Sequence, residues 1–193
     1  MDRRVLKTKK AVRQAYLELL RKKKDHRGIS VKDLVEEADI NRSTFYLHYY
    51  DIDVVLEELI EMMFENISSR IPEQGFQVNE MEKIIGEMSK QIEENKDYSL
   101  LVSKASDLPY FSEAMLRMMM KKVSTDTISN PNLNEEDKHF LMQVISQMTC
   151  NLTSYMIRNY DVKEIGSRFD LIKEYIFEPS LQKIMNQRPS DNA

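Results

Sequence analysis

The sequence predicts an all-α fold, and three observations support this prediction. Apolar residues recur at the three- and four-residue spacing of amphipathic helices along most of the 193-residue chain. The chain contains only 4 Gly and 5 Pro, too little turn-forming material for a protein of many short strands. Residues that favour helix starts, such as Ser30 and Asn134, precede several periodic segments. With 41% hydrophobic and 31% charged residues, the chain has the composition of a folded globular protein.

The first expected helix runs from about Val5 to Lys23. Its apolar face is made of Val12, Ala15, Tyr16, Leu19 and Leu20. Ser30 and Asp33 then form an acidic variant of the capping box, which predicts the start of a short second helix. One stripe of this second helix is apolar, and it comprises Val31, Leu34, Val35 and Ala38.

A third helix is expected from Arg42 to about Tyr49, after a tight turn at residues 39–41. Asn41 can cap this helix, because its side-chain oxygen can accept a hydrogen bond from a free backbone amide. Phe45 is expected to face the core. Two short helices joined by a three-residue turn form a helix-turn-helix unit.

Six further helices are expected after residue 50. Asp51 can cap the first of them, and Asn79 with Glu82 forms another cap pair. Asn134 is followed by three acidic residues, whose negative charge is favoured at a helix N-terminus. The expected ranges are about 52–70, 80–94, 98–103, 109–127, 135–159 and 162–186, the last with a kink at Pro179.

The helix-turn-helix segment carries the prediction of function. Its second helix has few inward side chains, so the others are free to face a groove of DNA, and small hydroxylated residues at helix starts let backbone amides approach phosphates. The candidate DNA-binding residues are Ser30, Lys32, Asn41, Arg42, Ser43, Thr44, Tyr46, Leu47 and His48.

The most specific part of this segment is the run Thr-Phe-Tyr-Leu-His-Tyr at residues 44–49. The pattern around it extends from about Thr8 to Leu56 and includes Ile29-Ser30-Val31, Leu34, Ala38, Ile40 to Tyr46, His48-Tyr49 and Leu56. This stretch, about a quarter of the chain, closely resembles the N-terminal domain of the tetracycline-repressor (TetR) family of bacterial one-component regulators. The resemblance implies a DNA-binding domain at residues 1–50 and a helical ligand-binding and dimerisation domain at residues 51–193.

Two residues depart from the pattern of that family. The family often has glycine where this chain has Asp39, and aspartate tolerates the positive φ of such a turn at modest cost. The family usually has lysine at the start of the fourth helix, where this chain has Ile52 between Asp51 and Asp53. Losing one phosphate contact should lower DNA affinity and its salt dependence. Lysines that could compensate are Lys7, Lys9, Lys10 and Lys32, although all four can equally be ordinary surface residues.

Charge is distributed unevenly along the chain. Residues 1–50 contain 13 Lys or Arg and 7 Asp or Glu, whereas the remaining residues contain 15 and 25. A basic N-terminal region on an acidic body indicates that only the N-terminal region meets a polyanion such as nucleic acid. The basic run at residues 21–27 can also be a solvated helix end whose cations are favoured by the helix dipole.

Methionine is concentrated in the acidic region, with 11 of the 13 methionines between residues 62 and 156. Methionine adapts to varied apolar shapes, which suits a pocket for small molecules, but a methionine-rich core needs no ligand. The family resemblance implies a pocket within residues 55–160 for an effector of unknown identity. The candidate lining is Met62, Met88, Tyr98, Met115, Met119, Met148 and Tyr155.

The last two expected helices have apolar residues on more than one face, which requires two packing partners. In the resembled family this pair packs against its copy, so the chain is expected to form a homodimer that binds a palindromic operator. The alternative is that both faces are buried within one monomeric bundle. The candidate interface residues are Leu141, Ile145, Leu152, Phe169, Ile172 and Ile176.

The sequence argues against several other classes of protein. A single cysteine, Cys150, excludes an internal disulfide and a multi-cysteine metal site, and the 3 histidines are scattered, so no catalytic group, metal or cofactor is expected. No apolar run approaches the ~20 residues of a membrane span, and the first residues lack the apolar stretch of a signal peptide, which predicts a cytoplasmic protein.

The expected function is therefore a ligand-responsive transcriptional regulator, in the simplest case a repressor, that binds double-stranded DNA. The alternative is an adaptor on the same scaffold that acts through protein–protein contacts and binds DNA weakly or not at all. The departure at Ile52 and its two flanking aspartates motivates this alternative.

Overall fold

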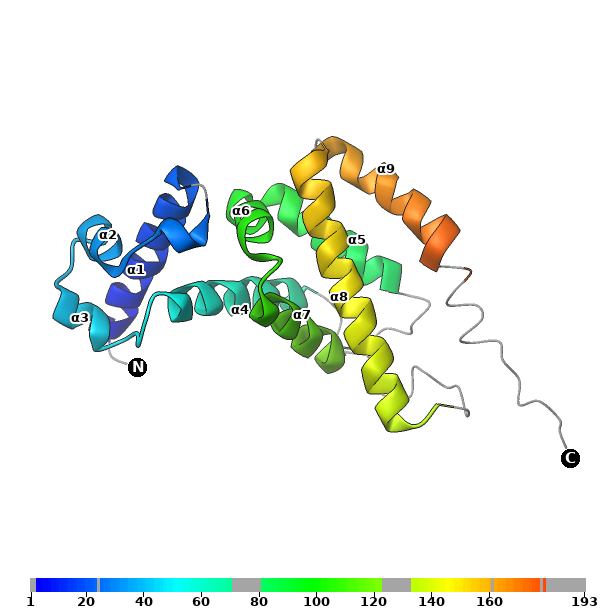
Figure 1. Ribbon diagram of the computed structural model, residues 1–193, viewed down its shortest axis with the longest axis horizontal. Helices are drawn as coiled ribbons and strands as arrows, with labels where there is room; N and C mark the ends of the chain where they lie inside the picture. The colour runs from blue at the N-terminus through cyan, green and yellow to red at the C-terminus, as the bar shows by residue number, and fades with distance from the viewer. Residues whose placement is uncertain are drawn as a thin grey trace, which may run out of the picture.

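The computed structural model describes residues 3–23, 25–70, 81–122, 133–160, 162–177 and 179. Within these residues all regular structure is helical, as predicted. Figure 1 shows a small group of helices at one end, a connecting helix, and a larger group at the other end. We call residues 3–50 the head and the described residues from Asp51 onward the body.

The head contains α1 (Arg3–Lys22), a 3₁₀ turn (His26–Gly28), α2 (Val31–Glu37) and α3 (Arg42–Tyr46). The predicted capping box at the start of α2 is confirmed. Asp33 N–H donates to the Ser30 hydroxyl, and Ser30 N–H donates to the Asp33 carboxylate, both at 3.2 Å. These two bonds satisfy backbone donors that a helix start leaves free. The predicted inward residues of α1, from Val12 to Leu20, are also buried.

The connection between α2 and α3 depends on Asp39, whose φ of 51° lies in the left-handed region. The sequence prediction of a positive φ at this position is therefore confirmed, and aspartate takes the place in which glycine is easiest to accommodate. Asn41 precedes α3 as predicted, but its exposed side chain makes no capping hydrogen bond. The start of α3 is therefore held by its backbone and by Phe45, not by a cap.

The prediction that α3 reaches Tyr49 was wrong by three residues. The amides of His48 and Tyr49 both donate to the Phe45 carbonyl, at 2.9 and 3.0 Å, so the chain tightens after Tyr46. This turn brings the Tyr49 ring back over the Phe45 ring, with centroids 5.6 Å apart in a stacked arrangement. The end of α3 therefore coincides with the packing of Tyr49 on Phe45.

Helix α4 (Asp53–Ser69) connects the head to the body, as its position in Figure 1 shows. Ile52 occupies the position before the helix, and the Asp51 carboxylate accepts the Val54 N–H at 3.1 Å, as the expected cap does. Buried side chains lie on two sides of α4, which packs on α1, α5 and α7: Val55, Leu56, Leu59, Ile60, Met63, Phe64, Ile67 and Ser68.

The body continues with α5 (Met81–Glu94), α6 (Lys96–Ala105), α7 (Pro109–Lys122), α8 (Glu135–Asn159), α9 (Val162–Ile172) and a π-helical turn (Lys173–Phe177). The capping box of Asn134 and Asp137 opens α8, which confirms that predicted start. Helix α6 begins two residues earlier than predicted, because Asn95 caps it.

Some sequence predictions lie outside the described residues. They are the cap at Asn79, the end of the helix expected to reach residue 127, and the continuation of the last helix to residue 186. Neither chain neighbour of Pro179 is described, so the expected kink there is not addressed.

One apolar core runs from the head through α4 into the body. It joins Tyr16, Leu34 and Phe45 to Phe64 and Met115, all at most 2% exposed. Because this core is continuous, packing alone does not divide the chain at residue 50. The division into two domains stays a prediction about function. Among the described helices, none has the length and apolar character needed to span a membrane.

Candidate nucleic-acid interface

Helix α3 presents most of its side chains to solvent. Arg42, Ser43, Tyr46 and Leu47 are exposed, the last to 78%, and we call these four residues the reading surface. Thr44 and His48 are half-buried at its edges. Phe45 is completely buried and is in edge-to-face contact with the Tyr46 ring, with centroids 5.3 Å apart. One buried aromatic residue therefore fixes a short helix whose other side chains remain available for a partner.

Arg42 and Tyr46 lie one helical turn apart and contact each other. Arg42 Nη2 donates to the Tyr46 hydroxyl at 3.3 Å, and the guanidinium carbon lies 5.6 Å from the centre of the Tyr46 ring. This contact orients a cation and a phenolic hydroxyl on the same side of α3. Both groups bind phosphates and base edges in DNA complexes.

A polar cluster joins Tyr49, which follows α3, to α1 and α4. The Tyr49 hydroxyl donates to Glu58 Oε2 at 2.5 Å, while Arg13 and Lys9 donate to Glu58 Oε1 at 2.9 and 3.3 Å. We call this cluster the near anchor. It joins the head to the second turn of α4, so the reading surface is held at a defined place relative to α4.

The near anchor also changes the titration of its members. Burial and the hydrogen bond to the Glu58 carboxylate raise the pKa of Tyr49. Burial alone would raise the pKa of Glu58, but the hydrogen bonds from Tyr49 and Lys9 and the charges of Lys9 and Arg13 outweigh it and lower that pKa. Glu58 therefore stays ionised. Lys9 was a candidate phosphate ligand, but its ammonium group contacts Glu58 instead.

The remaining predicted DNA-binding residues lie near the helix starts. Ser30 is exposed at the start of α2, and Lys32 projects from the same helix with a weak ion pair to Glu36 at 3.9 Å. Asn41 is exposed before α3. Ile52 packs against the core, and Asp53 is exposed beside it. Residues 51–53 therefore provide no positively charged side chain at the start of α4.

Sequence reasoning missed Tyr50, which is 87% exposed directly after the buried Tyr49. The available signal was a second tyrosine directly after Tyr49 in the sequence. The exposed ring of Tyr50 adds an aromatic residue to the end of the head near α3.

A groove of about 430 Å³ lies between the near anchor and α7. Its walls carry several glutamates and the cations that partly balance them. The lining residues are Lys9, His48, Tyr49, Val54, Glu57, Glu58, Glu61, Tyr110, Glu113 and Arg117. None of the predicted pocket residues lines this groove.

The seven predicted pocket residues do not share one environment. Met88 and Met115 are buried in the core and Tyr98 is half-buried against it. Met62 of α4 and Met148 and Tyr155 of α8 are exposed. The side chain of Met119 lies outside the described residues. An effector site around Met88, Tyr98 and Met115 remains a prediction.

The predicted dimer residues lie beside an exposed apolar surface. Leu141, Leu152 and Ile172 are half-buried and Ile176 is exposed; the side chains of Ile145 and Phe169 lie outside the described residues. Four large side chains of α8 face solvent and share one side of the helix, and we call them the α8 stripe: Phe140, Val144, Met148 and Tyr155. Leu171 in α9, and Tyr175 and Ile176 in the π-helical turn, are also exposed.

Comparison with solved structures gives the fold. A TetR transcriptional regulator from Streptococcus agalactiae 2603V superimposes with a TM-score of 0.62 at 24% identity, over 89% of this chain and 96% of that one. The protein has the fold of a TetR-type transcriptional regulator. The dihydroxyacetone kinase operon activator DhaS, at 19% identity, covers 88% of this chain and 96% of its own with a TM-score of 0.55.

The TetR-type fold is shared by a further solved structure, the fatty acid degradation regulator FadR from Bacillus halodurans. It covers 91% of this chain and 97% of its own, with a TM-score of 0.57 and 14% identity. At these identities the likeness establishes the fold and not the operator or the ligand.

A curated relative matches part of the chain more closely. The uncharacterized HTH-type transcriptional regulator YxbF of Bacillus subtilis (strain 168) is 38% identical over 61 residues, which are 32% of this chain and 16% of the relative. The chain therefore spans only a small part of the length of that relative. No protein-family model matches the chain. Two of these similar proteins are named transcriptional regulators, and the other two are named an operon activator and a degradation regulator.

Proposed function

We propose that this protein is a transcriptional regulator that binds double-stranded DNA through α3. The observation that carries the proposal is the reading surface: Phe45 is completely buried while Arg42, Ser43, Tyr46 and Leu47 face solvent. A short, rigidly supported helix of this kind fits the major groove of B-DNA. The excess of basic residues in the first fifty positions favours a polyanionic partner.

Each residue of the reading surface has a chemical role in this proposal. Arg42 can donate two hydrogen bonds to guanine, and Leu47 can contact a thymine methyl group. Ser43 and Thr44 are small enough to let the start of α3 approach a phosphate, and Tyr46 offers a hydroxyl beside Arg42. Ser30, Lys32, Asn41 and His48 surround this surface and would position the head on the sugar-phosphate backbone.

We propose that the body forms a homodimer through the α8 stripe and the apolar residues that follow it. An exposed apolar surface of this extent is unfavourable in water, and a second copy offers the same surface in return. The area would include Leu141, Leu152 and Ile172, which are already half-buried within one copy. A two-fold dimer places two α3 helices for half-sites about 34–36 Å apart, so the operator should be palindromic.

The body would also bind a small effector that prefers one spacing of the heads. Such a ligand lowers DNA affinity only by its difference in affinity for the two states, and DNA lowers ligand affinity by the same factor. We propose that the DNA-bound form blocks transcription, so that the effector releases a repressor. Met88, Met115 and the half-buried Tyr98 are the described candidates near such a site.

A binding selection from random duplexes tests the proposal. We expect recovered sequences to share two inverted half-sites, and Arg42→Ala to erase the preference at one base of each half-site. Lys121→Ala removes the same charge from an exposed position on α7 and should recover the wild-type sequences. Recovery of no common sequence, with binding unaffected by Arg42→Ala, would refute DNA reading by α3. That result would favour the adaptor function to which Ile52 and Asp53 point.

A further inference from the structure

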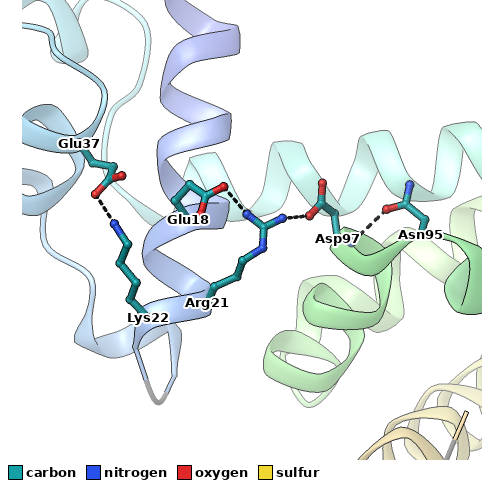
Figure 2. A network of polar contacts seen from close by, with 6 residues as sticks. All are labelled: Glu18, Arg21, Lys22, Glu37, Asn95 and Asp97. Atoms are coloured by element: carbon teal, nitrogen blue, oxygen red, sulfur yellow. Dashed lines mark hydrogen bonds and ion pairs between the residues drawn. The ribbon is translucent and has the colours of Figure 1, made fainter.

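The head meets the body at a second place, between the last turn of α1 and the first turn of α6. Figure 2 shows the Arg21 guanidinium between two carboxylates. Its Nη1 donates to Glu18 of the same helix at 2.5 Å, and its Nη2 donates to Asp97 of α6. We call the Arg21–Asp97 contact the far anchor.

Both partners of the far anchor are oriented by a neighbour on their own side. Glu18 lies three residues before Arg21 and contacts the same guanidinium group. Asn95 caps α6 by accepting the Asp97 N–H at 3.0 Å, which fixes the first turn of that helix. A carboxylate is also favoured at this position by the helix dipole. Local contacts therefore orient both side chains of the far anchor.

The two anchors hold α1 at two points. Arg13 of the near anchor and Arg21 of the far anchor are separated by about 12 Å along α1, at 1.5 Å per residue. A stiff helix held at both points resists tilting relative to the body. If the far anchor opens while the near anchor holds, each ångström of movement at Arg21 turns α1 by about 5°.

Exposure decides which anchor opens more easily. The side chains of Arg13 and Glu58 are 18% and 25% exposed, whereas those of Arg21 and Asp97 are 40% exposed each. Water and salt screen the more exposed pair more strongly. Helix α6 also contacts α8 at its other end, where Arg158 Nη2 lies 3.4 Å from the buried Ser106 hydroxyl. A shift of α6 relative to α8 would therefore move Asp97 and change its contact with Arg21.

We propose that Arg21 and Asp97 are positioning residues that set the orientation of the head on the body. The consequence for DNA rests on the proposed function: the orientation of each head fixes the spacing of the two α3 helices. Neither residue belongs to the reading surface. Their effect on DNA binding comes through the angle of α1.

The chain provides a matched control one residue away. Lys22 forms an ion pair with Glu37 at 2.8 Å, and Figure 2 shows this pair beside the far anchor. It joins α1 to α2, so both of its partners belong to the head and turn together with it. Lys22→Ala removes a cation and an exposed ion pair from the same helix end without releasing the head from the body.

The first test measures head orientation without DNA. Spin labels are placed at Arg27, in the 3₁₀ turn beyond the far end of α1, and at Lys90 on α5, both exposed, in protein that carries Cys150→Ser, diluted with unlabelled protein. We expect Arg21→Ala and Asp97→Asn to broaden the distance distribution, and Lys22→Ala to leave it unchanged. Arg21→Lys should restore the narrow distribution, because lysine can still pair with Asp97. Equal distributions in Arg21→Ala and the wild type would overturn the proposal.

The second test measures DNA binding on recovered operators whose half-site spacing is changed by one or two base pairs. We expect the wild type and Lys22→Ala to prefer one spacing, and Arg21→Ala to reduce that preference by about two- to fivefold, the range of an exposed ion pair. Unchanged preference in Arg21→Ala would overturn the role in spacing. If the wild type binds no DNA, the proposed function fails, and the distance measurement still decides whether the far anchor orients the head.

Discussion

The head and the body leave different kinds of surface uncovered. Around its buried Phe45, the head exposes the cation of Arg42 and the hydroxyls of Ser43 and Tyr46. The body exposes Phe140, Val144, Met148 and Tyr155 along one helix. Charged and hydroxylated groups suit a hydrated, charged partner, whereas an apolar stripe suits a partner that excludes water. Under the proposed function these are two interfaces, of which only the first should respond strongly to salt.

The largest expected effect distinguishes Phe45, which supports the reading surface from below, from Tyr46, which belongs to that surface. Phe45→Ala should lower the free energy of unfolding by about 3–5 kcal/mol, because it leaves a cavity in a fully buried site. Urea denaturation measures this change. Tyr46→Ala, one residue along and half-exposed, should change stability by less than about 1 kcal/mol while weakening DNA binding. Similar destabilisation by both changes would contradict this division of roles.

The second prediction concerns the apolar surface of the body. Met148→Glu should weaken the dimer by about 100-fold, equivalent to about 3 kcal/mol, because it places a carboxylate in an interface that excludes water. Analytical ultracentrifugation measures the change. The control is Gln147→Glu, which adds the same charge at the neighbouring exposed position of α8. A dimer that tolerates both substitutions equally would show that the α8 stripe is not the interface.

The third prediction concerns the near anchor, where head and body meet. Glu58→Gln should reduce stability at neutral pH by about 1–3 kcal/mol, since it weakens hydrogen bonds to a charged group. The pKa of Glu58 is lowered in the folded protein, so its ionised form stabilises the fold at neutral pH. This contribution disappears as the pH falls below the ordinary value of about 4.5. Denaturation should therefore show the wild type losing more stability than Glu58→Gln between about pH 6 and about pH 3.

The smallest expected effect concerns the helix caps, which occur in both the head and the body. The head and the body each contain one described capping box, at Ser30 with Asp33 and at Asn134 with Asp137. Ser30→Ala and Asn134→Ala should each reduce the free energy of unfolding by about 1 kcal/mol. Thermal denaturation of the two variants gives the comparison. A loss from Ser30→Ala alone would mean that the start of α8 does not take part in the cooperative transition.

Interactions close in sequence were the ones that could be predicted. The capping boxes join residues three positions apart, and the buried faces of α1 and α2 follow helical periodicity, so local patterns were sufficient. The same patterns predicted the reading surface, because its geometry depends on a five-residue helix and one buried ring.

Contacts between distant residues could not be predicted from these patterns. Lys9 meets Glu58 across 49 positions, and Arg21 meets Asp97 across 76. Periodicity also shows that α8 has two apolar faces without showing which one packs on its own chain. The family resemblance implied Met148 and Tyr155 as pocket residues, and both side chains face solvent in one copy.

The salt dependence of DNA binding tests the central claim most directly. With a duplex recovered by selection, we expect wild-type affinity to fall steeply as salt rises, by about 0.9 in log affinity per unit of log salt for each phosphate contact. Arg42→Ala should weaken binding by about tenfold or more, and Lys121→Ala should match the wild type. Affinity that ignores salt, together with equal binding by Arg42→Ala and Lys121→Ala, would contradict the assignment of α3 as the DNA-reading helix.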